Sequence, residues 1–123
     1  IAPTHQQTHP LLEFLQSPHC STLWRSMAIL AAAVMAPLGE EILFRGLLQS
    51  TIRRYTRSPW ISIVIASILF SAIHAGADIK SLPSLFALAI ALGYSYERTG
   101  RLIAPIMIHM IFNSVTLIEM LYT

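Results

Sequence analysis

MAILAAAVMAPLGEEILFR, residues 27–45, is an apolar helical stretch interrupted by two adjacent glutamates and one arginine. An acidic side chain at the centre of a membrane helix costs about 2.5–3.5 kcal/mol even on insertion-based scales, so such groups usually face a protein interior and mark a functional site. Glu41 and Arg45 are four residues apart, share one helix face and can form an ion pair. Glu40 lies about 100° away around the helix, which leaves its carboxylate free for chemistry.

Three further apolar segments follow, residues 60–77, 82–96 and 102–118, and none of them contains Asp, Glu, Lys or Arg. A bilayer core takes about 20 apolar helical residues, and these runs are slightly shorter. Aromatic residues near their ends could serve as interfacial anchors. A soluble bundle is the alternative, but its helices would each carry a polar stripe. The sequence predicts an all-α fold, a polytopic membrane helical bundle with about four transmembrane helices. Their expected bounds are residues 23–54, 60–77, 82–97 and 102–122.

Composition agrees with a membrane protein, because 54% of the 123 residues are hydrophobic and 11% are charged, against about 25% charged residues in soluble domains. The net charge of +2 comes with no basic stripe and no interleaved aromatics, so nucleic acid is not an expected partner. The single cysteine excludes an intrachain disulfide framework. We expect residues 1–22 to form a loop or interfacial segment and residues 23–123 to form the membrane domain. Because the chain begins with Ile, we expect a C-terminal fragment of a longer membrane protein.

Charge in the connecting loops predicts the orientation in the membrane. In a four-helix, up-and-down arrangement the first and third loops lie on one side, and five arginines fall in them. Arg25 and Lys80 fall on the other side. The positive-inside rule therefore places the arginine-rich side in the cytoplasm.

Polar residues recur at similar depths on three of the four segments. At about 1.5 Å per residue, Glu40 lies roughly 20 Å from Arg53, His74 about 21 Å from Trp60, and Asn113 about 17 Å from Leu102. His109 comes out shallower, at about 10 Å. The counts predict one shared site, although they place it beyond the middle of the membrane from the arginine-rich side.

The residue types at these positions suggest acid–base chemistry. A glutamate removed from water is a suitable general base, and His74 can assist it. His109 and Asn113 share one helix face, and their imidazole and amide could donate two hydrogen bonds to one oxygen, as a tetrahedral oxyanion requires. Two histidines and two glutamates are also a plausible ligand set for zinc, although the HExxH signature of zinc proteases is absent.

These residues resemble three motifs of the CaaX-protease and bacteriocin-processing membrane proteins, the CPBP or Abi family. Glu40-Glu41-Ile42-Leu43-Phe44-Arg45 is similar to the family's EExxxR motif. The stretch from Phe70 to His74 is similar to FxxxH, and the stretch from His109 to Asn113 is similar to HxxxN. The three motifs occur in order on the first, second and fourth apolar segments, and the resemblance covers residues 27–121.

The resemblance implies an intramembrane, glutamate-dependent endopeptidase of a bacterial cell membrane. In that reading Glu40 with His74 activates water, His109 with Asn113 stabilises the oxyanion, and Glu41 and Arg45 support them. The implied substrate is a CaaX-type prenylated protein or a bacteriocin-like peptide within the lipid bilayer, and no cofactor or metal is required.

Three alternatives stay open at the level of sequence. The first is a zinc-type intramembrane metalloprotease that uses the same side chains as ligands. The second is a non-catalytic membrane immunity or scaffold protein that binds a partner. The third is a path for protons or ions through the buried polar groups.

Overall fold

The computed structural model describes residues 9–76 and 79–122, and within these residues every regular element is helical. The predicted all-α fold is therefore confirmed. The elements are α1 (Pro10–Gln16), α2 (Thr22–Leu30), η1 (Ala31–Met35), α3 (Ala36–Glu41), η2 (Ile42–Gln49), α4 (Ser50–Thr56), α5 (Pro59–His74), η3 (Ile79–Ser81), α6 (Leu82–Thr99) and α7 (Ile103–Tyr122).

The ends of the long helices agree closely with the expected bounds. The elements α2 to α4 form one continuous helix, Thr22–Thr56. Ser21 caps its start by accepting a hydrogen bond from the backbone of Trp24, and the chain leaves it at Arg57 with a φ of 56°. Helix α6 ends at Thr99 and is followed by Gly100, where a φ of 66° suits a residue without a side chain. Helix α1 lies in the segment expected to be a loop or interfacial helix, while residues 1–8 are outside the described part.

The first long helix contains two π-helical stretches, η1 and η2, on either side of α3. Pro37 explains η1, because proline has no N–H to donate to the carbonyl four residues earlier. Ala36 instead donates its N–H to the carbonyl of Ala31, five residues back. π-Helical turns are rare and often occur at functional sites, and α3, which carries both glutamates, lies between these two stretches.

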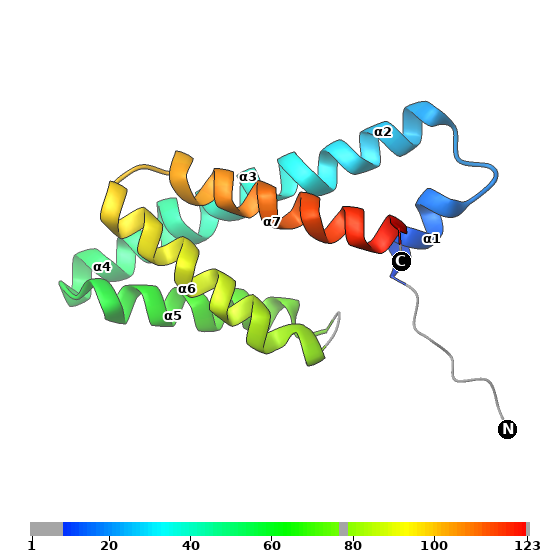
Figure 1. Cartoon of the computed structure of the whole chain (residues 1–123). Helices are drawn as coiled ribbons and strands as arrows, with labels where there is room; N and C mark the ends of the chain where they lie inside the picture. Colours follow the sequence, from blue (N-terminus) through cyan, green and yellow to red (C-terminus); the bar gives the residue numbers. More distant parts are fainter. Residues whose placement is uncertain (1–8, 77–78, 123) are drawn as a thin grey trace, which may run out of the picture.

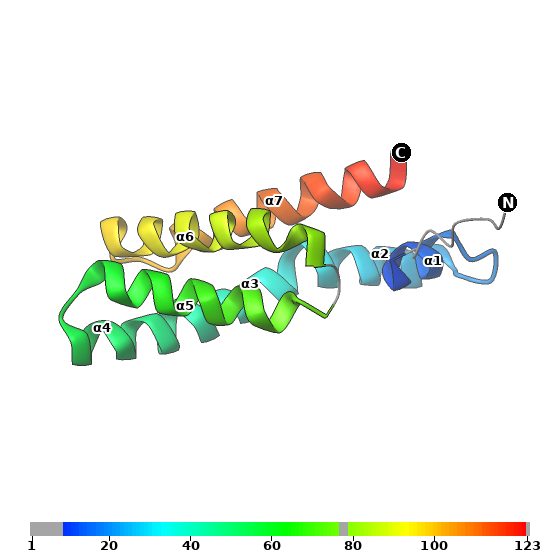
Figure 2. The ribbon, with the colours of Figure 1, turned by 90° about the horizontal axis from the view of Figure 1, so that it is seen from below.

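Two groups of helices make up the bundle (Figures 1 and 2). Helix α7 packs along η1 and α3, while α5 and α6 lie side by side, with α5 packed against η2 and α4. Helix α6 also contacts α7, so it joins the two groups. Phe44, Phe70 and Ala89 form the buried centre, one from each of η2, α5 and α6.

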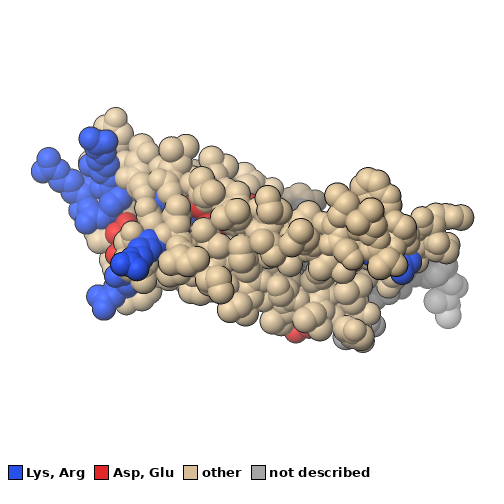
Figure 3. All heavy atoms as spheres, turned by 90° about the horizontal axis from the view of Figure 1, so that it is seen from above, with Lys and Arg blue, Asp and Glu red and all other residues tan. Residues whose placement is uncertain are grey.

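The outer surface is largely apolar, and the charge is concentrated at one end. Leu43, Ile68 and Ile111 each expose more than half of their surface. By length and composition, Thr22–Thr56 and Ile103–Tyr122 could each cross a membrane, and Pro59–His74 is a shorter apolar helix. Figure 3 shows that most Lys and Arg side chains gather at one end of the molecule. Arginines there include those in the last turns of α4 and α6.

Candidate active site

Glu41 and Arg45 form the buried foundation of the site. Arg45 Nη1 donates to Glu41 Oε1 at 3.1 Å, and both side chains are fully buried. The other guanidinium nitrogen, Nη2, donates to the carbonyl of Ala89 on α6 at 2.8 Å. The guanidinium also lies over the ring of Phe70, 5.1 Å from its centroid, which adds a cation–π attraction. The ion pair predicted from the four-residue spacing is present.

His109 brings α7 onto the same carboxylate. Its Nδ1 lies 2.6 Å from Glu41 Oε1, and the imidazole is buried. A carboxylate oxygen accepts hydrogen bonds when ionised, so His109 Nδ1 carries the proton in this contact. Glu41 Oε1 therefore receives hydrogen bonds from an arginine and a histidine, which fixes it between η2 and α7.

Glu40 points to a different pair of atoms. One of its oxygens lies 3.4 Å from His109 Nε2 and the other lies 3.9 Å from His74 Nε2. Unlike Glu41, the Glu40 side chain is 29% exposed, and that of His74 is 28% exposed. The residues from three helices thus converge at an accessible carboxylate, as the sequence predicted.

The second nitrogen of His74 shows which tautomer faces Glu40. Its Nδ1 lies 2.7 Å from the carbonyl oxygen of Phe70, and because a carbonyl can only accept, Nδ1 carries the proton. The Phe70 ring lies against the imidazole, with centroids 4.5 Å apart. His74 and His109 thus both use Nδ1 as an anchored donor and turn Nε2 toward Glu40.

This arrangement has a consequence for protons. An ionised Glu40 is an acceptor, and a neutral histidine that is protonated on Nδ1 has an acceptor at Nε2. Three acceptors facing one another repel unless a proton or a donor molecule lies among them. A water molecule could donate to both Glu40 and His74 across their 3.9 Å separation. The group can therefore orient a water molecule and take up its proton.

Asn113 lies one turn further along α7 than His109, and its amide Nδ2 donates to the carbonyl of Ala32 in η1 at 3.1 Å. The sequence analysis estimated the wrong depths for His109 and Asn113 along the helix bundle. His109 is level with Glu40 and Glu41 rather than shallower, and Asn113 is level with Ala32.

The physical reason is the depth at which α7 begins. A side chain on Gly46 would lie 3.3 Å from Leu102, just before α7. Gly46 is ten residues, about 15 Å along the helix, before the end of the first long helix at Thr56. The depth estimate assumed that all helices begin at the same depth in the membrane. Helix α7 begins deeper than the others, so the estimate placed its residues too shallow.

One polar residue of this region was missed by the sequence analysis. Gln49 is fully buried and lies four residues after Arg45, so Glu41, Arg45 and Gln49 form a series with a four-residue spacing in an apolar stretch. That spacing was a signal from which the sequence analysis could have found Gln49.

A metal site was the second point to check. No three His, Cys, Asp or Glu side chains in residues 9–76 and 79–122 are arranged as a ligand group.

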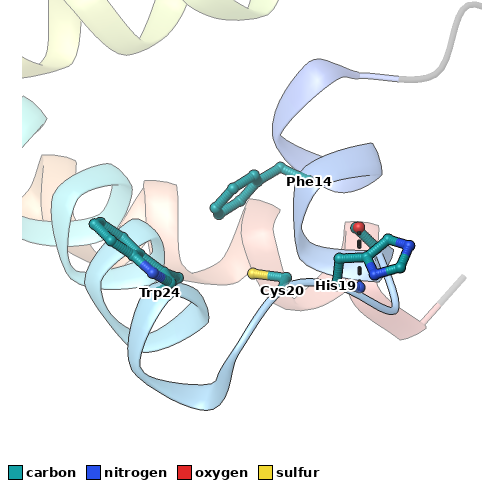
Figure 4. Close-up of a pocket in the computed structure, with 5 residues that line it drawn as sticks. Phe14, His19, Cys20 and Trp24 are labelled. Carbon is teal, nitrogen blue, oxygen red and sulfur yellow. Dashed lines mark hydrogen bonds between the residues drawn. The ribbon is translucent and has the colours of Figure 1, made fainter.

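An apolar pocket of about 480 Å³ lies elsewhere, between α1 and the start of α2 (Figure 4). Phe14, His19, Cys20 and Trp24 line it together with Ser17, whose hydroxyl accepts a hydrogen bond from the backbone of His19. None of the predicted site residues lies in it. Despite its size, this pocket is therefore not the candidate catalytic centre.

Comparison with known proteins gives a match over most of the chain. The family model described as type II CAAX prenyl endopeptidase Rce1-like matches residues 22–115. This range contains all three motif segments and all of the predicted site residues, from Glu40 to Asn113. No solved structure matches the chain.

Three bacterial relatives are similar in sequence. An uncharacterized 24.3 kDa protein of Escherichia coli is 34% identical over 86 residues, which is 68% of this chain and 40% of that protein. YdiL of Bacillus subtilis (strain 168), described as a proposed membrane peptidase, is 28% identical over 77% of this chain and 38% of its own length. YpbD of the same organism is uncharacterized and 35% identical, over 71% of this chain and 42% of its own length. The chain spans about two fifths of the length of these curated relatives.

Proposed function

Because the chain belongs to the Rce1-like family of type II CAAX prenyl endopeptidases, we propose that it carries the catalytic centre of a membrane endopeptidase with Glu40 as the general base. The observation that carries this proposal is the convergence of two Nε2 atoms, from His74 and His109, on one accessible carboxylate. Glu41, which is buried and paired, is left to support the site.

The reaction is the hydrolysis of a peptide bond. Glu40, assisted by His74, takes a proton from water, and the resulting hydroxide attacks the carbonyl carbon of the scissile bond. The carbonyl oxygen becomes an oxyanion. When this intermediate collapses, the C–N bond breaks, and the proton held by Glu40 or His74 passes to the leaving amine. The products are a new carboxyl terminus and a free amine.

His109 and Asn113 are the proposed oxyanion donors. For His109 to donate through Nε2 while Nδ1 donates to Glu41, its ring must hold both protons, and two carboxylates contact it. Asn113 Nδ2 has two hydrogens, and the carbonyl of Ala32 takes one, which leaves one for an oxyanion.

The proposed substrate is a peptide or a prenylated protein with a CaaX-type carboxyl terminus, bound at a bacterial cell membrane. The family supports the first part, because its description is that of a CAAX prenyl endopeptidase. The relatives support the bacterial location, because all three come from bacteria. A bacteriocin-like peptide is the second substrate class to test.

The proposal requires no cofactor. The family supports this assignment, since the Rce1-like proteases are glutamate-type enzymes. The side chains alone are also compatible with a zinc protease, because Glu40, His74 and His109 have the chemistry of zinc ligands. A chelation experiment therefore belongs with the activity test.

The test compares wild type with Glu40→Gln, in detergent, on a panel of prenylated and unprenylated peptides. Glutamine keeps the shape of glutamate but cannot take a proton, and general bases contribute about 10²–10⁴-fold. We expect kcat to fall by at least about 10²-fold while peptide binding persists. Glu119→Gln, ten residues beyond His109 on α7, is the matched control and should cleave like wild type.

Wild-type activity should survive a strong chelator. Loss of activity that zinc restores would instead move the assignment to a zinc protease. A biological effect that persists unchanged in Glu40→Gln would show that the protein acts as a scaffold or immunity protein.

A further inference from the structure

Gln49 has no part in the proposed chemistry, yet its side chain is fully buried and uses its amide nitrogen twice. Nε2 donates to the carbonyl oxygen of Gly93 at 3.1 Å and to Glu97 Oε1 at 3.4 Å. Burying an amide is costly unless it is hydrogen-bonded. An apolar side chain would be simpler at this position if packing were its only role.

The hydrogen bond to Gly93 repeats, one turn later, the bond that Arg45 makes. Arg45 Nη2 donates to the carbonyl of Ala89, and Gln49 Nε2 donates to the carbonyl of Gly93. Donor and acceptor are 44 residues apart in both bonds. Two bonds with the same offset fix one register of η2 along α6, because a slip of either helix would break both.

Gly93 makes the second bond possible. A Cβ on this residue would lie 2.9 Å from Gln49 Oε1 and 3.1 Å from Ile63 Cγ2, and real Cβ atoms essentially never come as close as the first distance. A larger residue at this position would therefore require the Gln49 amide and the Ile63 side chain to move. Gln49 Oε1 is itself buried without a hydrogen-bond partner among the described residues, so its contact with Gly93 is one of packing rather than hydrogen bonding.

We propose that Gln49, seated on Gly93, is a positioning residue for Glu41 and, through His109, for the catalytic carboxylate of Glu40. The connection runs through atoms already in contact: the register set at Gly93 places Arg45, Arg45 holds Glu41, and Glu41 holds His109 Nδ1. His109 Nε2 in turn faces Glu40. The inference rests on the proposed function, and it assigns to α6 a role in catalysis that acts through Arg45 and Glu41.

The direct test replaces Gln49 with methionine, which has similar length but no amide. Glu97 keeps its contacts with Ser62 and Arg53 in this variant, so no carboxylate is left alone. Small misplacements of reacting groups can cost about 10²-fold. We therefore expect kcat on a prenylated peptide to fall about 10- to 100-fold with KM nearly unchanged. Thr51→Val, an exposed change on the same helix, should leave both values unchanged.

Gly93→Ala tests the same contact without changing the polarity of Gln49. We expect a similar loss in kcat. If both changes act through the one contact, the double variant Gln49→Ala/Gly93→Ala should be no slower than Gln49→Ala alone, since residues in contact give non-additive effects. This pair also keeps the test possible if Gln49→Met cannot be purified.

A spectroscopic readout separates positioning from general stability. The ¹⁵N resonances of the imidazoles report the hydrogen bond between His109 Nδ1 and Glu41. In Gln49→Met the His109 signals should shift while those of His74, anchored within α5 by Phe70, stay in place. Unshifted His109 signals, or a kcat equal to wild type, would overturn the proposal. If the wild type cleaves no peptide, the proposed function fails, and the His109 signals still decide the positioning role.

Discussion

At the scale of single residues, two adjacent glutamates have different surroundings because a helix turns about 100° per residue. Glu41 points inward and receives hydrogen bonds from Arg45 and His109. Glu40 is partly exposed and faces two Nε2 atoms. One carboxylate is thus held by two hydrogen-bond donors and the other is accessible, a difference that is set by side-chain direction rather than by residue type.

The role of Arg45 leads to a prediction about stability. Arg45→Ala leaves Glu41 buried with one of its two donors removed, and breaking a buried pair in this way costs about 3–5 kcal/mol. We expect a marked fall in the thermal midpoint in detergent, together with loss of activity. Arg54→Ala, at an exposed site on α4, is the control and should unfold like wild type. An Arg45→Ala protein with wild-type expression, midpoint and activity would refute this role.

At the scale of the helices, the site depends on where α7 begins. Leu102 lies against Gly46, and this contact sets the level of His109 relative to Glu41. Asn113 adds a second link by bonding to Ala32 in the π-helical stretch η1. The level of α7 is therefore fixed at two points along the first long helix.

A larger residue at Gly46 should disturb this level. Its Cβ would lie 3.3 Å from Leu102 Cδ1, whereas a Cβ on Gly39 would have no neighbour within 4 Å. Overpacking typically costs about 1–3 kcal/mol, so Gly46→Val should lower the thermal midpoint. Gly39→Ala should raise it slightly or leave it unchanged, because alanine favours a helix by about 0.5–1 kcal/mol over glycine. Equal midpoints for the two variants would show that the contact with Leu102 does not set the packing.

The same elements show how far the sequence could lead. Long uncharged apolar runs predicted the helices, because a bilayer core takes about 20 apolar helical residues. The four-residue spacing predicted the pair of Glu41 with Arg45. The partner of His109 could not be read in this way, because it depends on the offset between two helices that are 68 residues apart at this contact. The packing of Leu102 on Gly46 and the bond from Asn113 to Ala32 determine that offset.

At the scale of the whole molecule, the bundle has one arginine-rich end and an opposite end formed by α1 and the start of α2 (Figures 1 and 3). Cys20 is the single cysteine of the chain and lies between α1 and α2. The two ends therefore mark the two sides of the membrane, if the protein spans it as proposed.

Cys20 is a built-in probe of orientation. The positive-inside rule places the arginine-rich end in the cytoplasm, so Cys20 should face the outside. A membrane-impermeant maleimide should then label it in intact cells, with Cys20→Ser as the control. Labelling only after the cells are opened would show the reverse orientation, with the arginines outside.

The central claim is that Glu40 activates water for peptide hydrolysis, and cleavage in H₂¹⁸O tests it most directly. Wild-type protein should produce a peptide whose new carboxyl terminus contains one ¹⁸O atom, seen by mass spectrometry as a mass increase of about 2 Da. Glu40→Gln, purified in the same fold, should give no labelled product above background. Equal amounts of labelled product from wild type and Glu40→Gln would contradict the account.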